Sequence, residues 1–159
     1  MRNLIVGISD IKMSTSPEDV IVTYALGSCV GVAIYDPGAR VGGMIHCMLP
    51  LSKMDLAKAQ ANPCMFVDTG IPALFEASYR LGARKDRIIV KVAGGSSILD
   101  ENGIFKIGER NYTIVRKIFW KNNVLISGED VGGALSRTMY LEMETGRVSI
   151  RSSGQIRDL

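Results

Sequence analysis

The chain has 159 residues, a length that suits one domain, residues 1–159, with a single hydrophobic core. Its 19 basic and 16 acidic residues give a net charge of +3 and are spread along the sequence, which argues against nucleic-acid binding. The longest uncharged stretch, residues 20–35, is shorter than the roughly 20 apolar residues of a membrane-spanning helix, so no membrane insertion is expected.

The three cysteines, at positions 29, 47 and 64, do not suggest a disulfide framework. Their number is odd, their spacing is wide, and the apolar run at residues 4–6 is too short for a secretory leader. We therefore expect free thiols and a cytoplasmic protein.

Short apolar runs separated by turn residues predict β-strands in the first third of the chain. These runs cover residues 3–8, 20–26 and 30–35. Asp36-Pro37-Gly38 predicts a turn, because proline fixes φ and glycine accepts positive φ. A strand at residues 41–48 would then form a hairpin with residues 30–35.

Two stretches with helical spacing of apolar residues follow, at 66–81 and 108–122. The first is expected to end at Gly82, and Pro72 predicts that it starts or kinks there. Residues 52–62 suggest a loop or a poorly anchored helix. Further strands are predicted at 87–92, 124–127, 138–143 and 147–151. The predicted fold is α/β, more narrowly an α+β sandwich of mixed or antiparallel β-sheets with about two longer helices.

One cysteine and the single histidine are placed for joint chemistry. Cys29 lies in a Gly-Ser-Cys-Val-Gly turn between two predicted strands, where glycine permits a sharp bend and close approach of a substrate. The hairpin of residues 30–35 and 41–48 would bring His46 near it from the adjacent strand. A thiol needs such a neighbour, because it is largely protonated at neutral pH.

Further groups would complete a hydrolytic site. The turn at Gly27 and Ser28 can leave backbone N–H groups unpaired and directed at one point, as an oxyanion hole requires. A catalytic histidine also needs a partner that fixes its tautomer. Thr23, on the strand that leads into the turn, is a candidate through its hydroxyl or its backbone carbonyl.

Simpler interpretations of these residues stay open. Free cysteines are among the most buried residue types, a histidine among apolar neighbours is often a core residue, and threonine favours strands. A zinc site of Cys29, His46, Cys47 and Cys64 lacks a C-x-x-C pair, and adjacent strand residues point to opposite faces. Residues 94–96 lack the pattern of a phosphate-binding loop. No metal or organic cofactor is expected.

Two longer motifs carry a resemblance to a known family. They are Leu26-Gly27-Ser28-Cys29-Val30-Gly31-Val32 and Gly43-Met44-Ile45-His46-Cys47-Met48-Leu49-Pro50. The similarity continues at residues 68–74, 107–111, 130–133 and 145–148, and so covers nearly the whole chain. In these motifs the sequence resembles the CheD family of chemoreceptor glutamine deamidases.

The resemblance implies Cys29 as nucleophile, His46 as general base and acid, and Thr23 as the group that orients His46. It also implies a fold similar to the catalytic domain of cytotoxic necrotizing factor toxins. The implied substrates are glutamine side chains of methyl-accepting chemotaxis receptors, which would be converted to glutamate through a thioester. A CheC-type phosphatase, which acts on CheY-phosphate, is the implied partner.

Two other functions stand beside this one. The first is a binding module that regulates a CheC-type phosphatase, with deamidation secondary. The second is a small thiol hydrolase that acts on free glutamine, which the lack of an evident metabolite-binding motif disfavours.

Overall fold

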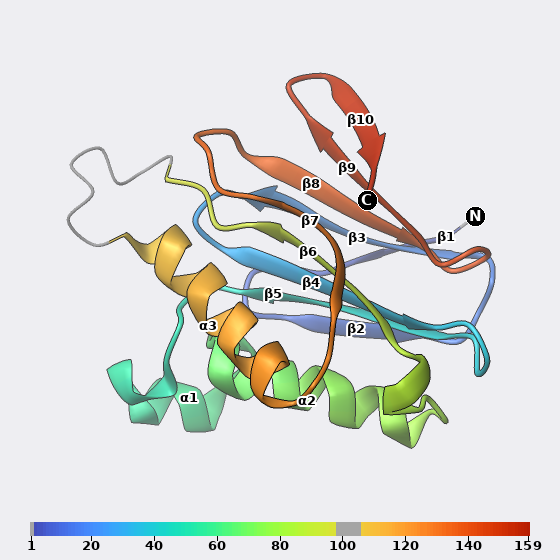
Figure 1. The fold of residues 1–159 in the computed structure, drawn as a ribbon, viewed down its shortest axis with the longest axis horizontal. Helices are drawn as coiled ribbons and strands as arrows, with labels where there is room; N and C mark the ends of the chain where they lie inside the picture. The colour runs from blue at the N-terminus through green and yellow to red at the C-terminus, as the bar shows by residue number, and fades with distance from the viewer. Residues whose placement is uncertain (1, 98–105) are drawn as a thin grey trace.

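Two five-stranded sheets stack face to face in the computed structural model, which describes residues 2–97 and 106–159 (Figure 1). The first sheet has the strand order β1-β3-β8-β9-β10, formed by β1 (Arg2–Ile5), β3 (Asp19–Leu26), β8 (Arg137–Glu142), β9 (Arg147–Ser152) and β10 (Gln155–Asp158). The second has the order β2-β5-β4-β6-β7, formed by β2 (Ile11–Ser14), β5 (Val41–Cys47), β4 (Val30–Asp36), β6 (Ile89–Gly94) and β7 (Ile126–Val131). Each sheet contains one parallel pair, β1 with β3 and β6 with β7, so both are mixed.

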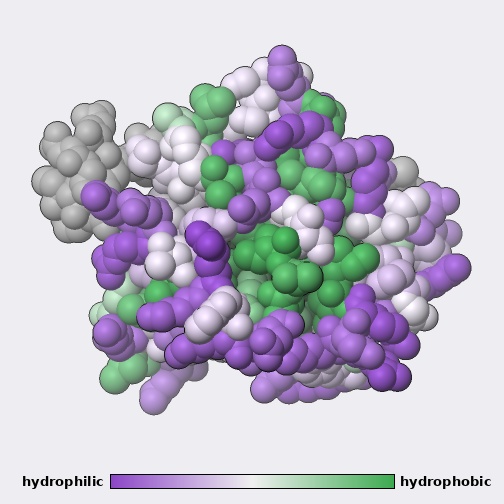
Figure 2. All heavy atoms as spheres, in the orientation of Figure 1, coloured by the Kyte–Doolittle hydropathy of each residue, from purple (hydrophilic) through white to green (hydrophobic). Residues whose placement is uncertain are grey.

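Helices cover the outer face of the second sheet (Figure 1). The two longer ones are α2 (Val67–Arg80) and α3 (Ile107–Lys121), and α3 lies between the parallel strands β6 and β7 in the chain. The shorter elements are α1 (Leu56–Ala61) and the 3-10 helices η1 (Ser52–Met54), η2 (Pro63–Met65) and η3 (Lys85–Arg87). Seen from the same side, much of the surface is hydrophilic around a central hydrophobic area (Figure 2).

The central strands β4 and β5 are buried on both faces, and alternate residues enter two different cores. Val30, Val32 and Ile34 pack with the helices, whereas Ala33 and Tyr35 pack against the first sheet. Such two-sided burial explains why both strands are nearly continuous apolar runs in the sequence. It also means that successive residues of β5 point alternately toward the helices and toward the first sheet, so a shift of one position exchanges the two cores.

The predicted α+β class, with mixed sheets and two longer helices, is confirmed, and the hairpin of β4 and β5 is present. The C-terminal glycine of α2 is also as predicted, since Gly82 has φ of 102° and follows the last turn. The similarity to the cytotoxic necrotizing factor domain stays a prediction.

Other boundaries were predicted wrongly. The helix predicted at residues 66–81 spans Val67–Arg80, so of the two alternatives for Pro72 a start at that residue is wrong; Val67 N–H donates to Leu49 O at 2.8 Å and anchors the first turn five residues earlier. The first strand ends at Ile5 instead of residue 8. The strands β2 and β10 were not predicted: each has four residues, and all four of β10 are exposed, so neither shows a clear apolar alternation.

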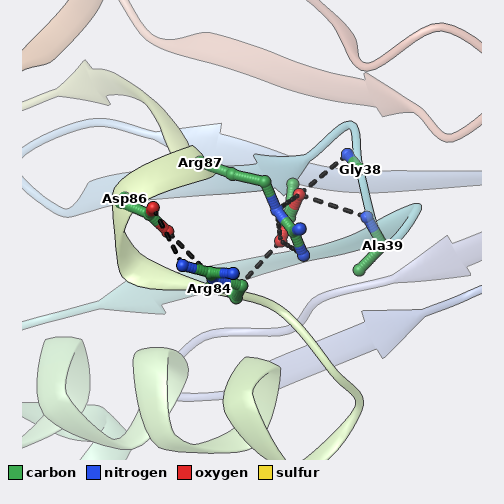
Figure 3. Close-up of polar contacts among 6 residues, drawn as sticks. Gly38, Ala39, Arg84, Asp86 and Arg87 are labelled. Atoms are coloured by element: carbon green, nitrogen blue, oxygen red, sulfur yellow. Dashed lines mark hydrogen bonds and ion pairs between the residues drawn. The ribbon is translucent and has the colours of Figure 1, made fainter.

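A buried carboxylate fixes the turn that closes the β4–β5 hairpin (Figure 3). Asp36 accepts hydrogen bonds from the N–H groups of Gly38 at 2.8 Å, Ala39 at 3.2 Å and Arg84 at 2.8 Å. Arg87 adds an ion pair at 3.0 Å. Burial alone would raise the pKa of Asp36, but the hydrogen bonds from Arg87 and from the three N–H groups bring it below its ordinary value. The carboxylate is therefore charged and holds η3 against the hairpin.

Replacing this carboxylate tests how much the hairpin turn contributes to stability. We expect Asp36→Ala to lower the free energy of unfolding by about 2 kcal/mol, because it leaves Arg87 and three partly buried N–H groups without their acceptor. The measurement is urea denaturation followed by circular dichroism. Asp86→Ala is the matched control, since Asp86 pairs with Arg84 in the same cluster but is 66% exposed, and a loss below about 1 kcal/mol is expected. Equal losses for the two variants would contradict the assignment.

Candidate active site

The turn between β3 and β4 brings Cys29 and His46 to the same side of the second sheet. His46 in β5 pairs directly with Gly31 in β4, and Cys29 precedes Gly31 by two residues. Because side chains alternate along a strand, both side chains lie on the face toward the first sheet as diagonal neighbours. Cys29 accordingly packs against the core between the sheets. Cys47, next to His46, belongs instead to the core beneath the helices, so the expected divergence of these two residues is confirmed.

Thr23 reaches His46 from the opposite sheet. Its hydroxyl oxygen lies 2.7 Å from His46 Nδ1 and 2.7 Å from the carbonyl oxygen of Val6. A carbonyl can only accept, so the single hydroxyl proton goes to Val6. The hydroxyl oxygen must then accept a proton from Nδ1–H, which leaves the lone pair of the imidazole on Nε2. Of the two groups of Thr23 considered from sequence, the contact therefore uses the hydroxyl.

His46 is fully buried and uncharged. Its exposed fraction is 0%, and Nε2 has no hydrogen-bond partner among the described residues. Burial lowers the pKa of His46 to about 4, because the imidazolium would lose its hydration. At neutral pH the ring is therefore a neutral base whose accepting nitrogen is unoccupied.

Cys29 differs from the other two cysteines in its exposure. It is partly exposed, whereas Cys47 and Cys64 are buried, and all three thiols are free. Burial raises the pKa of Cys29, and its own backbone N–H opposes this shift more weakly. Burial also raises the pKa of Cys47, which lies on the far side of the sheet. Cys29 is thus the thiol that a substrate can reach, and it is protonated at rest.

The backbone of the Cys29 turn supplies two N–H groups that donate to no backbone carbonyl within the described ranges, those of Ser28 and Cys29. The N–H of Gly27 donates to Ala25 O at 3.0 Å. It is therefore not a free donor for an oxyanion, although its place in the turn made it a candidate. Ala25 itself has φ of 57° and lies in the bulge between Thr23 and Leu26 in the pairing of β3 with β8, one residue before β3 ends at Leu26. Gly27 therefore shapes the turn, while Ser28 and Cys29 keep donors for a ligand.

The loop after β6 holds the Cys29 turn by backbone hydrogen bonds. Gly95 N–H donates to Cys29 O, and Ser96 N–H donates to Gly27 O, both at 2.9 Å. A side chain on Gly94 would place its Cβ 2.2 Å from Cys29 O, so this close approach requires glycine. The Gly-rich segment 94–96, which lacks a phosphate-binding pattern, thus supports the turn.

Two contributors to the site were not identified from the sequence. One is the carbonyl of Val6, which a sequence pattern cannot single out because every residue has one. The other is Asn111 in α3, whose side-chain amide donates to Ser28 O at 2.9 Å and to Met48 O at 3.1 Å. Asn111 lies within a motif of the noted resemblance, residues 107–111, and that motif was the available signal.

Comparisons with known proteins show the family to which this chain belongs. The sequence model of the CheD family, described as CheD chemotactic sensory transduction, matches residues 48–152. A Syntrophus aciditrophicus protein named probable chemoreceptor glutamine deamidase CheD 1 is 57% identical, over 97% of this chain and 96% of its own. A Solibacter usitatus protein named probable chemoreceptor glutamine deamidase CheD is 48% identical, over 100% and 94%. This chain belongs to the CheD family.

A solved structure shows the same fold at much lower sequence similarity. The Neisseria meningitidis protein NMB0706 superposes with a TM-score of 0.50 and 10% identity, over 84% of this chain and 64% of its own. The likeness supports the arrangement of sheets and helices in this CheD protein. Among the described residues, no helix is long and apolar enough to cross a membrane.

The buried neutral histidine predicts how stability depends on pH. His46 binds a proton below about pH 6.5 in the unfolded chain but only below about pH 4 in the folded one, so acid favours unfolding in that window. We expect the free energy of unfolding to fall by about 2 kcal/mol between pH 7 and pH 5. Urea denaturation across this range measures it.

The control is His46→Asn, which removes the single histidine of the chain and keeps an N–H that can reach Thr23. In this variant the loss between pH 7 and pH 5 should disappear. The pKa values of Asp10, Asp19 and Asp36 lie below their ordinary value of 3.8, so these groups act at lower pH. An unchanged pH slope in His46→Asn would contradict the assignment.

Proposed function

We propose that this CheD protein is a cysteine-dependent deamidase that converts glutamine side chains of methyl-accepting chemotaxis receptors to glutamate. The observation that carries the proposal is the buried hydrogen bond from His46 Nδ1 to Thr23, which leaves Nε2 as a base on the face that Cys29 shares. The substrate comes from the relatives, whose names describe chemoreceptor glutamine deamidases. The chemistry comes from the site.

In the first step the Cys29 sulfur attacks the carboxamide carbon of the glutamine. Because both the thiol and the imidazole are neutral at rest, the thiol proton moves to His46 Nε2 as the S–C bond forms. The carboxamide oxygen becomes an oxyanion, and the N–H groups of Ser28 and Cys29 are the donors proposed to stabilise it.

In the second step the same proton completes the leaving group. His46 Nε2–H protonates the amide nitrogen and the C–N bond breaks. Ammonia departs, and the glutamine acyl group remains on Cys29 as a thioester. Neutral His46 then takes a proton from water, whose oxygen attacks the thioester carbon. Collapse of the second oxyanion releases glutamate, and the proton returns to the sulfur.

The reaction changes the charge of the substrate. Each turnover replaces a neutral amide by a carboxylate, so the receptor helix gains a negative charge. Like charges on neighbouring helical turns are destabilising, which would shift the packing of the receptor's signalling helices. The same thioester route applies to a methyl ester, in which methanol replaces ammonia as the leaving group.

Location and partner belong to the same proposal. We place the protein in the cytoplasm, because a reducing compartment keeps the Cys29 thiol free for the reaction. A CheC-type phosphatase is the proposed regulatory partner. The binding-module function is the alternative in which this partnership outweighs deamidation.

Mass spectrometry of a receptor cytoplasmic domain tests the activity. We expect incubation with the protein to convert defined receptor glutamines to glutamate, and Cys29→Ala and His46→Ala to abolish the conversion. Cys64→Ala is the matched control, since it removes a buried thiol on the helical side and should keep activity. Free glutamine, assayed in parallel, should not be hydrolysed. A folded wild-type protein that modifies no receptor would sink the deamidase proposal and favour the binding module.

A second test concerns the group that orients His46. Thr23→Val removes the acceptor of Nδ1–H, so we expect kcat to fall about 10–100-fold, the size of loss found when a metal-bound histidine loses its orienting partner. Thr23→Ser keeps the hydroxyl and should stay close to wild type. Steady-state kinetics of ammonia release separates kcat from KM. If both variants were equally active, the hydroxyl would have no orienting role.

A further inference from the structure

The side chain of Asn111 joins the two segments that carry the proposed catalytic pair. Its exposed fraction is 0%, and it projects from the first turns of α3. One amide nitrogen donates to Ser28 O, next to Cys29, and to Met48 O, two residues beyond His46. An amide nitrogen has two N–H bonds, so each carbonyl receives one. These contacts span 83 and 63 residues of sequence.

This arrangement leaves one polar atom of Asn111 unsatisfied. Its Oδ1 is buried and has no hydrogen-bond partner among the described residues. The reversed amide would place Oδ1 against two carbonyl oxygens, which is worse, so the orientation is fixed by its neighbours. An unpaired buried acceptor costs about 1–3 kcal/mol. Because this cost is borne, we infer that the position of the two carbonyls bound by Asn111 matters for the site.

The carbonyl of Ser28 and the N–H of Cys29 belong to one peptide unit. The unit is trans, so these two groups point in opposite directions. Fixing the carbonyl toward α3 therefore fixes the direction of the Cys29 N–H. That N–H donates to no backbone carbonyl in the described part of the chain, and its interaction with the thiol of the same residue partly opposes the rise in the pKa of Cys29 caused by burial.

Each of the three carbonyls of the turn accepts a hydrogen bond, and each has a different donor. Gly27 O accepts from Ser96 N–H, Cys29 O from Gly95 N–H, and Ser28 O from the Asn111 side chain. The start of α3 is docked on the same loop, since a Cβ on Gly108 would lie 2.2 Å from Ser96 O. Of the three donors, the one to Ser28 can be removed by a side-chain substitution.

We propose that Asn111 is a positioning residue that holds the Ser28–Cys29 peptide so that the Cys29 N–H stabilises the oxyanion of the deamidation. Through Met48 O it also fixes this peptide relative to the end of the strand that carries His46. The inference rests on the proposed function, since it concerns the oxyanion of that reaction. Asn111 acts through the peptide and does not touch the substrate.

The test separates oxyanion stabilisation from the reactivity of the thiol. In Asn111→Ala we expect kcat for receptor deamidation to fall about 100-fold, the effect of losing one oxyanion donor, with KM unchanged. Alkylation of Cys29 by iodoacetamide proceeds at a tetrahedral carbon and forms no oxyanion. Its rate and pH profile should therefore stay within about twofold of wild type.

Two further variants complete the design. Asn111→Asp has the same shape but no N–H donor, so it should lose kcat as Asn111→Ala does, and it serves if the alanine variant fails to fold. Asn122→Ala is the matched control: Asn122 caps the other end of α3 by donating to Ile118 O and is exposed, so kcat should not change.

The outcomes are distinct. An unchanged kcat in the folded Asn111 variants overturns the inference alone. A parallel loss of deamidation and of alkylation also overturns it, because that would show a general disturbance of the turn. An inactive wild type, or an active Cys29→Ala, would instead overturn the proposed function, and the inference with it. Thermal denaturation establishes which variants are folded.

Discussion

The register between β4 and β5 is the constraint on which the site depends. Gly31 faces His46 across the hairpin, and this pairing sends the imidazole toward the first sheet and Cys47 toward the helices. A slip of one residue would reverse both side chains and bury the histidine beneath the helices. The buried Asp36 acts against such a slip, because it accepts two hydrogen bonds within the hairpin turn and binds Arg84 N–H and the Arg87 side chain at η3. The side of the sheet on which His46 lies is therefore fixed by contacts at the opposite end of the hairpin.

Burial determines how the proposed pair can work. A dry environment disfavours both the imidazolium and the thiolate, so a stable ion pair of Cys29 and His46 is not the resting state. The thiol must then lose its proton during attack, when the histidine gains charge only transiently. For this the lone pair has to be on Nε2 beforehand. The Thr23 hydroxyl sets it there, since its own proton is committed to Val6 O.

The sequence was informative where function depends on local patterns. The Gly-Ser-Cys turn, the single histidine and the apolar alternation predicted the hairpin and made Cys29, His46 and Thr23 candidates, and the resemblance to the CheD family implied their roles. It was silent on contacts that join distant segments, such as the bonds from Asn111 to Ser28 and Met48. It left open whether the helix starts or kinks at Pro72, because the hydrogen bond from Val67 to Leu49 that anchors an earlier start joins separate segments and has no local pattern.

The loop that supports the cysteine turn is itself held between the two sheets. Arg137, in β8 of the first sheet, is 8% exposed and donates to Gly94 O at 3.3 Å and to Gly132 O at 2.8 Å. Its ion pair with Asp130 at 3.3 Å joins it to β7 of the second sheet. Removing one partner of such a buried pair would leave an uncompensated charge beside the loop. The support of the Cys29 turn thus depends on packing between the two sheets as well as on the hydrogen bonds of the turn itself.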